Sequence, residues 1–169
     1  PYTISDSGLV YSEPTLIFNP ANVSGGPIIF SDSQVVNVSL IAVEDNVGNA
    51  LQSPYSWSFT VDITPPEVVN TSPPDSATNV PIPTIITAIF NEQMDASTLD
   101  TTTIILFTNS DTIRGLVTYD SSTYTVIYIP LSHLLEGVTY TVTITTGVKD
   151  LAGNGLLTDY SWIFTTQDS

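Results

Sequence analysis

Cysteine is missing from this 169-residue chain, and lysine and arginine together number only 2. Without cysteine the chain forms no disulfide bond, no thiolate metal site and no cysteine nucleophile. Recognition of nucleic-acid phosphates or anionic lipid surfaces needs clustered lysine and arginine, so both classes of partner are excluded. No apolar run approaches the roughly 20 residues that span a bilayer, which excludes direct membrane insertion as a helix.

Histidine and methionine occur once each, as His133 and Met94. A histidine-dependent triad would rest on a single residue in an expected loop. The same two residues are too few soft ligands for a convincing copper site. Glycoside hydrolysis needs a pair of carboxylates in a sugar-sized cleft, and we expect no such cleft at the neighbouring carboxylates Glu92 and Asp95. We therefore expect no enzymatic activity.

Acidic residues are plentiful: 17 aspartates and glutamates give a net charge of −15. Charged residues nevertheless make up only 11% of the chain, so serine, threonine and asparagine supply most of the polar surface. A surface of hydroxyls and scattered carboxylates is typical of an extracellular, cell-surface protein. Carboxylates without cationic partners also favour divalent cations as counter-ions.

A duplicated segment sets the domain organisation. Val43–Leu51 (VEDNVGNAL) and Tyr55–Thr60 (YSWSFT) return about 105 residues later as Val148–Leu156 (VKDLAGNGL) and Tyr160–Thr165 (YSWIFT). A period this long predicts tandem domains rather than a solenoid. We expect an incomplete module over residues 1–62 and a complete one over 63–169, joined by a stiff link at Pro65-Pro66.

Short runs of Thr, Val, Ile, Tyr and Phe between Pro, Gly, Asn and Asp predict an all-β fold. Val138–Thr145 alternates strictly, as a half-buried antiparallel strand does. We expect seven strands, near Glu67–Thr71, Thr84–Phe90, Thr102–Phe107, Ile113–Tyr119, Tyr124–Ile129, Val138–Thr145 and Tyr160–Thr166. Such a set predicts an immunoglobulin-like β-sandwich. Trp162 and Phe164, and likewise Trp57 and Phe59, are expected to point into a core.

The first module has only the back half of this pattern. Gly8–Tyr11 and Leu16–Pro20 match Gly115–Tyr119 and Val126–Pro130, but the counterpart of Thr84–Phe90 is missing. Loss of that central strand would expose apolar side chains and unpaired backbone edges. Two interpretations stay open: the sequence is a piece of a longer chain, or a neighbouring subunit supplies the strand.

The second module resembles the bacterial Ig-like domains of the SbsA type, the Big_5 family. The matching segments are Thr64–Val68 (TPPEV), Ser72–Pro81 (SPPDSATNVP), Phe90–Asp95 (FNEQMD), Val148–Asn154 (VKDLAGN) and Tyr160–Thr165 (YSWIFT). The resemblance covers nearly all of 63–166, and the first module keeps only its back half. It implies a non-catalytic spacer or structural module of large cell-surface proteins, S-layers and adhesins.

Calcium is the best chemical hypothesis. In a sandwich of this type, the loop after the second strand, the last hairpin and the incoming linker meet at one pole. The carboxylates of Asp62, Glu92, Asp95 and Asp150 would then converge, and Ca²⁺ takes six to eight such oxygens. Alternatively, Asp-x-x-Gly-Asn is only a turn, in which Asp caps backbone N–H groups and Gly accepts a positive φ.

These observations together predict a structural spacer, stalk or assembly module of a surface protein or filament. Its expected partners are neighbouring Ig-like modules or identical subunits. The alternative function is a binding module that recognises a glycan or a protein through loops at one pole.

Overall fold

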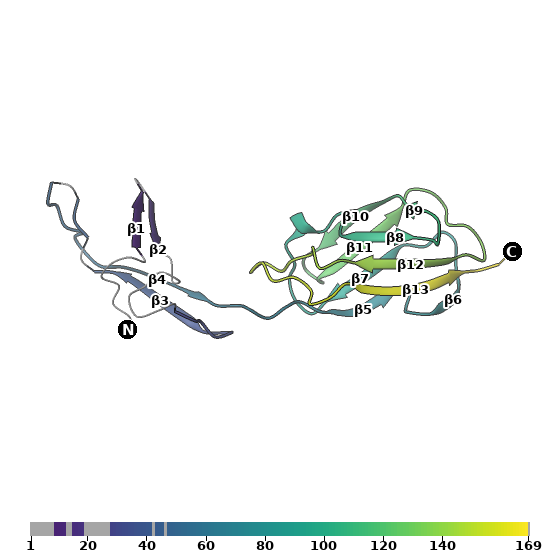
Figure 1. The fold of residues 1–169 in the computed structure, drawn as a ribbon, viewed down its shortest axis with the longest axis horizontal. Coiled ribbons are helices and arrows are strands. Elements are labelled where there is room, and N and C mark those ends of the chain that lie inside the picture. Colours follow the sequence, from purple (N-terminus) through teal and green to yellow (C-terminus); the bar gives the residue numbers. More distant parts are fainter. Residues whose placement is uncertain (1–8, 13–14, 19–27, 42, 46, 169) are drawn as a thin grey trace. The chain divides into compact units, whose positions relative to one another are not determined.

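A computed structural model describes residues 9–12, 15–18, 28–41, 43–45 and 47–168 of the chain. The chain forms two compact units, Pro1–Ile63 and Thr64–Ser169 (Figure 1). Among the described residues there is no helix with the length and hydropathy that crossing a membrane requires.

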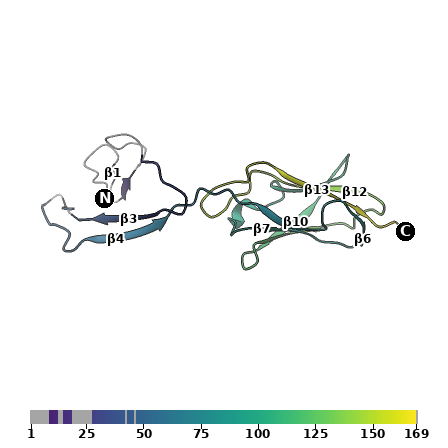
Figure 2. The ribbon, with the colours of Figure 1, turned by 90° about the horizontal axis from the view of Figure 1, so that it is seen from below.

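The second unit is a β-sandwich of two sheets, and the predicted all-β, immunoglobulin-like class is confirmed. One sheet has the strand order β10-β11-β7-β5, and the other has the order β6-β13-β12-β8-β9. Figure 2 shows the two sheets as separate layers. The strands are β5 (Val68–Ser72), β6 (Ala77–Val80), β7 (Ile86–Phe90), β8 (Ile104–Phe107), β9 (Thr112–Ile113), β10 (Gly115–Asp120), β11 (Thr125–Pro130), β12 (Thr139–Ile144) and β13 (Tyr160–Thr166).

The core lies between the sheets and follows the predicted alternation. On β12 the side chains of Tyr140, Val142 and Ile144 are fully buried, while the threonines between them face outward. On β13, Trp162 is 2% exposed and Phe164 is 0% exposed, as predicted. Because the side-chain period of a strand is two residues, a single slip in register would turn this whole set to the solvent.

One predicted strand divides in two. The expected strand Ile113–Tyr119 is wrong as a single element, because Arg114 separates β9 in one sheet from β10 in the other. The Tyr128 hydroxyl donates a hydrogen bond to the Ile113 carbonyl at this crossing (2.5 Å). A Cβ on Gly115 would collide with the Tyr128 ring, so the chain passes the ring closely only because residue 115 is glycine.

Strand β6 was absent from the sequence-based prediction. It pairs in parallel with β13, with Ala77 opposite Phe164 and Val80 opposite Thr166. Its sequence, Ala-Thr-Asn-Val, carries a weak apolar alternation, and Asn79 adopts a positive φ of 56°. Asparagine tolerates this left-handed region better than most residues, so the segment is more typical of a turn than of a strand.

The first unit contains two hairpins. β1 (Leu9–Ser12) pairs with β2 (Thr15–Phe18), and β3 (Val35–Leu40) pairs with β4 (Tyr55–Thr60), each pair antiparallel. The two pairs are separate sheets.

The β3–β4 hairpin repeats the register of β12–β13. Val38 lies opposite Trp57 as Val142 lies opposite Trp162. The burial does not repeat: Trp57 is 43% exposed and Phe59 is 46% exposed. The prediction that these two rings enter a core is therefore wrong for this unit, because no second sheet covers them among its described residues.

Candidate functional site

The duplicated Asp-x-x-Gly-Asn motif forms the same turn in both units. The Asp45 carboxylate accepts hydrogen bonds from the backbone N–H (2.8 Å) and side-chain amide (2.7 Å) of Asn49. The Asp150 carboxylate accepts the same pair from Asn154, both at 2.8 Å. These bonds lower the pKa of Asp45, with the backbone N–H of Asn49 as the largest cause. The turn interpretation therefore accounts for both aspartates.

The glycine of each turn has a structural reason. Gly48 has a φ of 87° and Gly153 a φ of 95°, in the region where a Cβ is unfavourable. The two turns differ in burial, since Asp150 is 2% exposed and Asp45 is exposed. In the second unit the turn is thus anchored in the protein interior.

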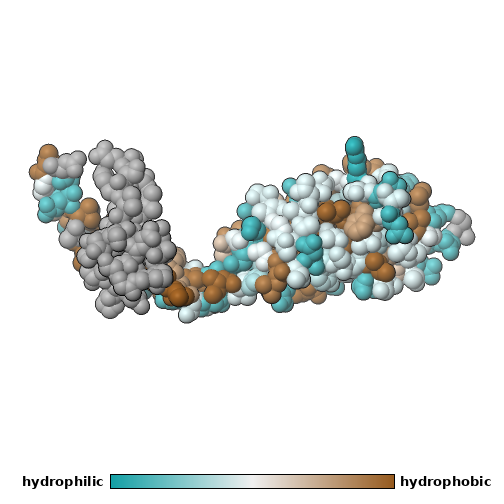
Figure 3. Space-filling model, in the orientation of Figure 1, coloured by the Kyte–Doolittle hydropathy of each residue, from teal (hydrophilic) through white to brown (hydrophobic). Residues whose placement is uncertain are grey.

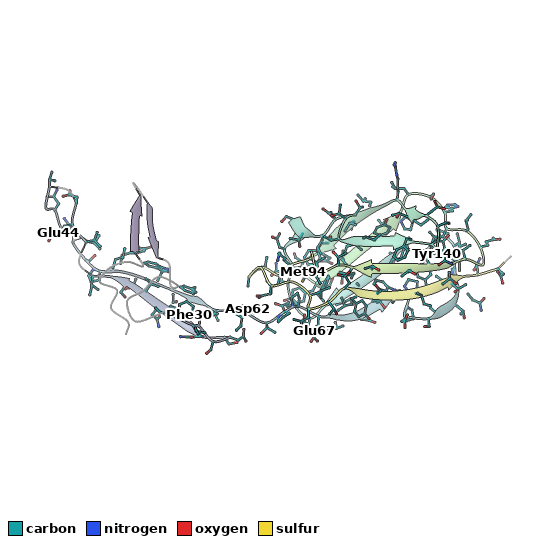
Figure 4. All side chains as sticks on the ribbon, viewed as in Figure 1. Phe30, Glu44, Asp62, Glu67, Met94 and Tyr140 are labelled. Atoms are coloured by element: carbon teal, nitrogen blue, oxygen red, sulfur yellow. The ribbon has the colours of Figure 1, made fainter. Side chains whose placement is uncertain are left out.

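Three segments of the second unit meet at the end where the chain enters it, which we call the proximal pole. The Glu67 N–H donates to the Asn91 side-chain oxygen (2.8 Å), and the Asn91 N–H donates to the Glu67 carbonyl (3.0 Å). The Asp95 N–H donates to the Lys149 carbonyl (2.8 Å), beside the Asp150 turn. Figure 4 shows Glu67 and Met94 toward this end of the unit, with Tyr140 toward the other. The loop 91–95, the start of β5 and the 150–154 turn therefore share one pole.

Two of the predicted calcium ligands come together at this pole. Carboxylate oxygens of Glu92 and Asp150 lie within 4.8 Å of each other. Asp62 belongs to the first unit, two residues before Thr64, where the second unit begins. Covalent geometry alone keeps the Cα atoms of Asp62 and Thr64 within about 7 Å.

Asp95 has a different task. It is the N-cap of a short 3-10 helix, Ala96–Thr98, and its Oδ1 accepts hydrogen bonds from the backbone N–H (2.9 Å) and hydroxyl (2.7 Å) of Ser97. The hydroxyl bond is the largest cause of the lowered pKa of Asp95. Both bonds end on one oxygen of this half-buried carboxylate.

The Asp-x-Ser/Thr turn is a recurring device in the second unit. In each case a hydroxyl two residues later donates to the carboxylate, at 2.6–2.7 Å, and lowers its pKa. The pairs are Asp95 with Ser97, Asp100 with Thr102 and Asp120 with Ser122. Local hydroxyls thus take the place of basic residues, of which the chain has only 2.

His133 lines an open groove of about 590 Å³ together with Ser110 and Asp111. The Ser110 hydroxyl donates its hydrogen bond to the Asp111 carboxylate (3.0 Å). A serine nucleophile would instead donate to an imidazole base. This arrangement is not that of an activated serine.

The parallel pair β6–β13 is a structural feature that sequence reasoning missed. The Ser76 N–H donates to the Ile163 carbonyl (2.8 Å), and the Gln167 N–H donates to the Val80 carbonyl (3.0 Å). The Asp75 carboxylate accepts a further bond from the Ile163 N–H (3.0 Å). We call this set of bonds the clamp. The one sequence signal of the clamp is the Ser-Pro-Pro-Asp-Ser run before β6, and this run indicates a turn rather than a strand.

A family model described as a bacterial Ig-like domain matches residues 62–166. Among solved structures, the N-terminal part of the bacterial S-layer protein SbsC is similar, with 23% identity and a TM-score of 0.48 over 62% of this chain and 24% of that chain. The copper resistance protein PcoC from Escherichia coli is 17% identical, with a TM-score of 0.50 over 62% of this chain and 100% of that chain. CopC from Methylosinus trichosporium OB3b is 13% identical, with a TM-score of 0.50 over 61% and 94% of the two chains. Among curated proteins, none matches the chain.

Proposed function

The chain belongs to the bacterial Ig-like domain family, and on this premise we propose that it is a non-catalytic structural spacer in an extracellular cell-surface protein. The protein class that fits is an S-layer, an adhesin stalk or a filament. The observation that carries the proposal is the position of the two chain ends of the second unit. The chain enters at the proximal pole, where Glu67 pairs with Asn91. It leaves at the other pole, where Gln167 bonds Val80 (Figure 1).

A module whose chain enters at one pole and leaves at the other is suited to being joined in series with other modules. A force applied to the two ends pulls β6 toward the proximal pole and β13 toward the other, because the strands are parallel. The clamp hydrogen bonds then resist together, in shear, rather than opening one after another. This geometry supports a mechanical role.

The surface supports an extracellular location. The visible face of the second unit is mostly of intermediate hydropathy, with scattered polar and apolar residues (Figure 3). Paired hydroxyls lie across neighbouring strands: Thr139 with Thr165 (2.8 Å) and Thr143 with Ser161 (2.7 Å). We infer that the partners are neighbouring Ig-like modules or identical subunits, since a module whose chain enters and leaves at opposite poles is suited to being joined to like modules.

The second candidate function is an adhesive module, which the groove around His133 favours. A glycan array and a cell-surface pull-down with the full chain separate the two functions. A spacer is expected to give no reproducible binding to any glycan or surface protein other than like modules. Saturable binding that Ser110→Ala or His133→Ala abolishes, while the unfolding temperature stays the same, would identify an adhesin instead.

We also propose that Ca²⁺ binds at the proximal pole through Asp62, Glu92, Asp95 and Asp150. The proximity of the Glu92 and Asp150 oxygens supports this, as does the short covalent tether to Asp62. Asp95 would contribute through Oδ2, since Oδ1 caps the 3-10 helix. A Ca²⁺ ion bound by both the linker and the sandwich would fix the angle between modules.

Millimolar Ca²⁺ is therefore expected to raise the unfolding temperature of the full chain, because a ligand that binds only the folded state stabilises it. Differential scanning calorimetry with added Ca²⁺ and with a chelator measures the shift. Glu92→Gln should remove the shift, whereas the control Asp111→Asn, in the groove of His133, should keep it. An identical unfolding temperature with and without Ca²⁺ would end the hypothesis.

A further inference from the structure

Strand β10 leaves one edge of its sheet open. In the order β10-β11-β7-β5, it pairs with β11 on one side, and no described strand lies on its other side (Figure 1). β10 runs from Gly115 to Asp120 in regular register, without a bulge or a proline. An edge of this kind is a template for a further strand, and proteins usually shorten, bend or interrupt such edges.

The other edges of the second unit are interrupted in these ways. β9 has only 2 residues, and β6 pairs irregularly with β13 and contains Asn79 at a positive φ. β5 is bulged between Val68 and Asn70, and it lies between the proline pairs Pro65-Pro66 and Pro73-Pro74. β10 is therefore the one long and regular open edge among the described strands of this unit.

The hydrogen-bond phase of β10 fixes which backbone groups face the open edge. The Leu131 N–H donates to the Arg114 carbonyl (2.9 Å), so these two residues form a hydrogen-bonded pair of the β10–β11 ladder. In an antiparallel ladder such pairs alternate with pairs that exchange no hydrogen bond. Gly115, Val117 and Tyr119 therefore direct their backbone N–H and C=O groups away from β11, toward the open edge.

The outer row of side chains along this edge has a charge of opposite sign at each end. Arg114 is exposed directly before β10, and Asp120 is exposed at its last position. The N–H (2.9 Å) and hydroxyl (2.6 Å) of Ser122 both donate to Oδ1 of Asp120 and hold this carboxylate in place. Leu116 and Thr118 lie exposed between the two charges, because β10 alternates between exposed and half-buried residues.

Arg114 is one of only 2 basic residues in the chain. The other, Lys149, donates from its ammonium group to the Gly153 carbonyl (3.1 Å). Within the described part of the chain, no carboxylate forms an ion pair with Arg114. The guanidinium beside the open edge is thus available to an acidic group of a partner.

We propose that β10 pairs antiparallel with β10 of a second copy of the chain, which joins two modules edge to edge about a two-fold axis at Val117. This register sets the two copies of Val117 opposite each other and Gly115 of each copy opposite Tyr119 of the other. Every edge-facing N–H and C=O group of β10 then has a partner. The inference rests on the proposed function, in which identical subunits are partners.

The same register brings opposite charges together. Arg114 of each copy lies opposite Asp120 of the other, and Leu116 lies opposite Thr118. These are positions without a backbone hydrogen bond, where facing side chains approach most closely. A shift by two residues keeps the backbone phase, but it separates Arg114 from Asp120 and leaves edge-facing groups unpaired. Backbone phase and charge therefore select one register.

A second copy is the partner that meets both requirements. An extended segment of a different protein would satisfy the same backbone groups, but it would also need an acidic and a basic residue at the matching positions. The net charge of −15 on each chain opposes association at long range. At physiological ionic strength this repulsion is screened beyond a Debye length of about 8 Å, so the facing charge pairs decide whether the edges join.

Sedimentation equilibrium of the full chain tests the proposal at about 0.15 M ionic strength. The chain is expected to pass from monomer to dimer between about 1 µM and 1 mM protein. Arg114→Asp and Asp120→Arg should each raise the dimer dissociation constant at least about tenfold, because like charges then face each other at both ends. An equimolar mixture of these two variants should dimerise as the unchanged chain does, because each facing pair again has opposite charges.

Glu67→Arg is the matched control. It makes the same change of charge as Asp120→Arg, but directly before β5, at the opposite edge of the same sheet. It should leave the dissociation constant unchanged. Amide hydrogen exchange followed by NMR locates the contact: the N–H groups of Gly115, Val117 and Tyr119 should exchange more slowly as the chain dimerises, whereas those bonded to β11 should not change.

A chain that stays monomeric up to about 1 mM would overturn the proposal. So would a dimer that neither substitution weakens, or two weakened variants whose mixture stays monomeric. The unfolding temperature of each variant is measured alongside, and Arg114→Asp, which breaks no ion pair within the described part of the chain, keeps the test decisive should Asp120→Arg weaken the fold. None of these outcomes bears on the spacer function, which is tested by pulling on a single chain.

Discussion

Replacing Phe164 with alanine is expected to lower the free energy of unfolding of the second unit by about 3–5 kcal/mol, the range for a large aromatic side chain removed from a core. Phe164 is 0% exposed and stacks on Tyr140, with ring centroids 5.6 Å apart. Its removal leaves a cavity between the sheets. Since single domains are stable by about 5–15 kcal/mol, the loss is a large share of the total.

The repeat supplies a matched control. Phe59 occupies the corresponding position in β4 but is 46% exposed, so Phe59→Ala removes few buried contacts and should leave the second unit unchanged. Calorimetry of the full chain, supported by urea unfolding, measures both variants. Equal losses of unfolding free energy in Phe59→Ala and Phe164→Ala would show that Phe59 is as deeply packed as Phe164, contrary to its 46% exposure.

Local patterns made much of the sandwich predictable. The strict alternation in Val138–Thr145 identified β12 and its inward side chains, and the aromatic alternation around Trp162 identified β13. Strand β6 was not predictable in this way, because its pairing is with a strand almost 90 residues later and its own pattern is weak. The change of sheet at Arg114, between β9 and β10, was not predictable either, because the apolar pattern continues across it.

The first unit shows the limit of reasoning from a repeat. The match to Tyr160–Thr165 correctly placed β4, but it could not say whether the facing sheet is present. Burial depends on that second layer, so Trp57 was assigned to a core that the described residues do not form.

At the proximal pole, which segments meet and what each carboxylate bonds follow from different features of the sequence. The order of strands predicted that the loop 91–95 and the Asp150 turn are neighbours, and the Asp95–Lys149 hydrogen bond joins them. The roles of the carboxylates followed local sequence instead: Asp150 holds Asn154, and Asp95 holds Ser97. Whether a cation joins Asp62 and Glu92 to them depends on a ligand that sequence patterns do not specify.

Pulling the chain by its two ends is expected to unfold the second unit in one cooperative event. The clamp and the antiparallel β5–β7 pair are loaded in shear, so they should fail together rather than one bond at a time. Unfolding of Thr64–Ser169 should release roughly 350–380 Å of contour length, at about 3.3–3.6 Å for each residue. The two hairpins of the first unit should open at lower force, since the described part of that unit gives them no second layer of contacts.

Asp75 provides a specific variant. Asp75→Ala removes the carboxylate that accepts from the Ile163 N–H, so the unfolding force should fall while the released length stays the same. The control Asp111→Ala removes a carboxylate that bonds Ser110 outside the clamp, and it should leave the force unchanged.

Single-molecule force spectroscopy on the full chain measures both quantities at once and bears most directly on a mechanical role. The spacer function predicts one force peak of this length, higher than any event from the first unit and lowered by Asp75→Ala. A second unit that extends gradually, or yields at the force that opens the β3–β4 hairpin, would contradict it.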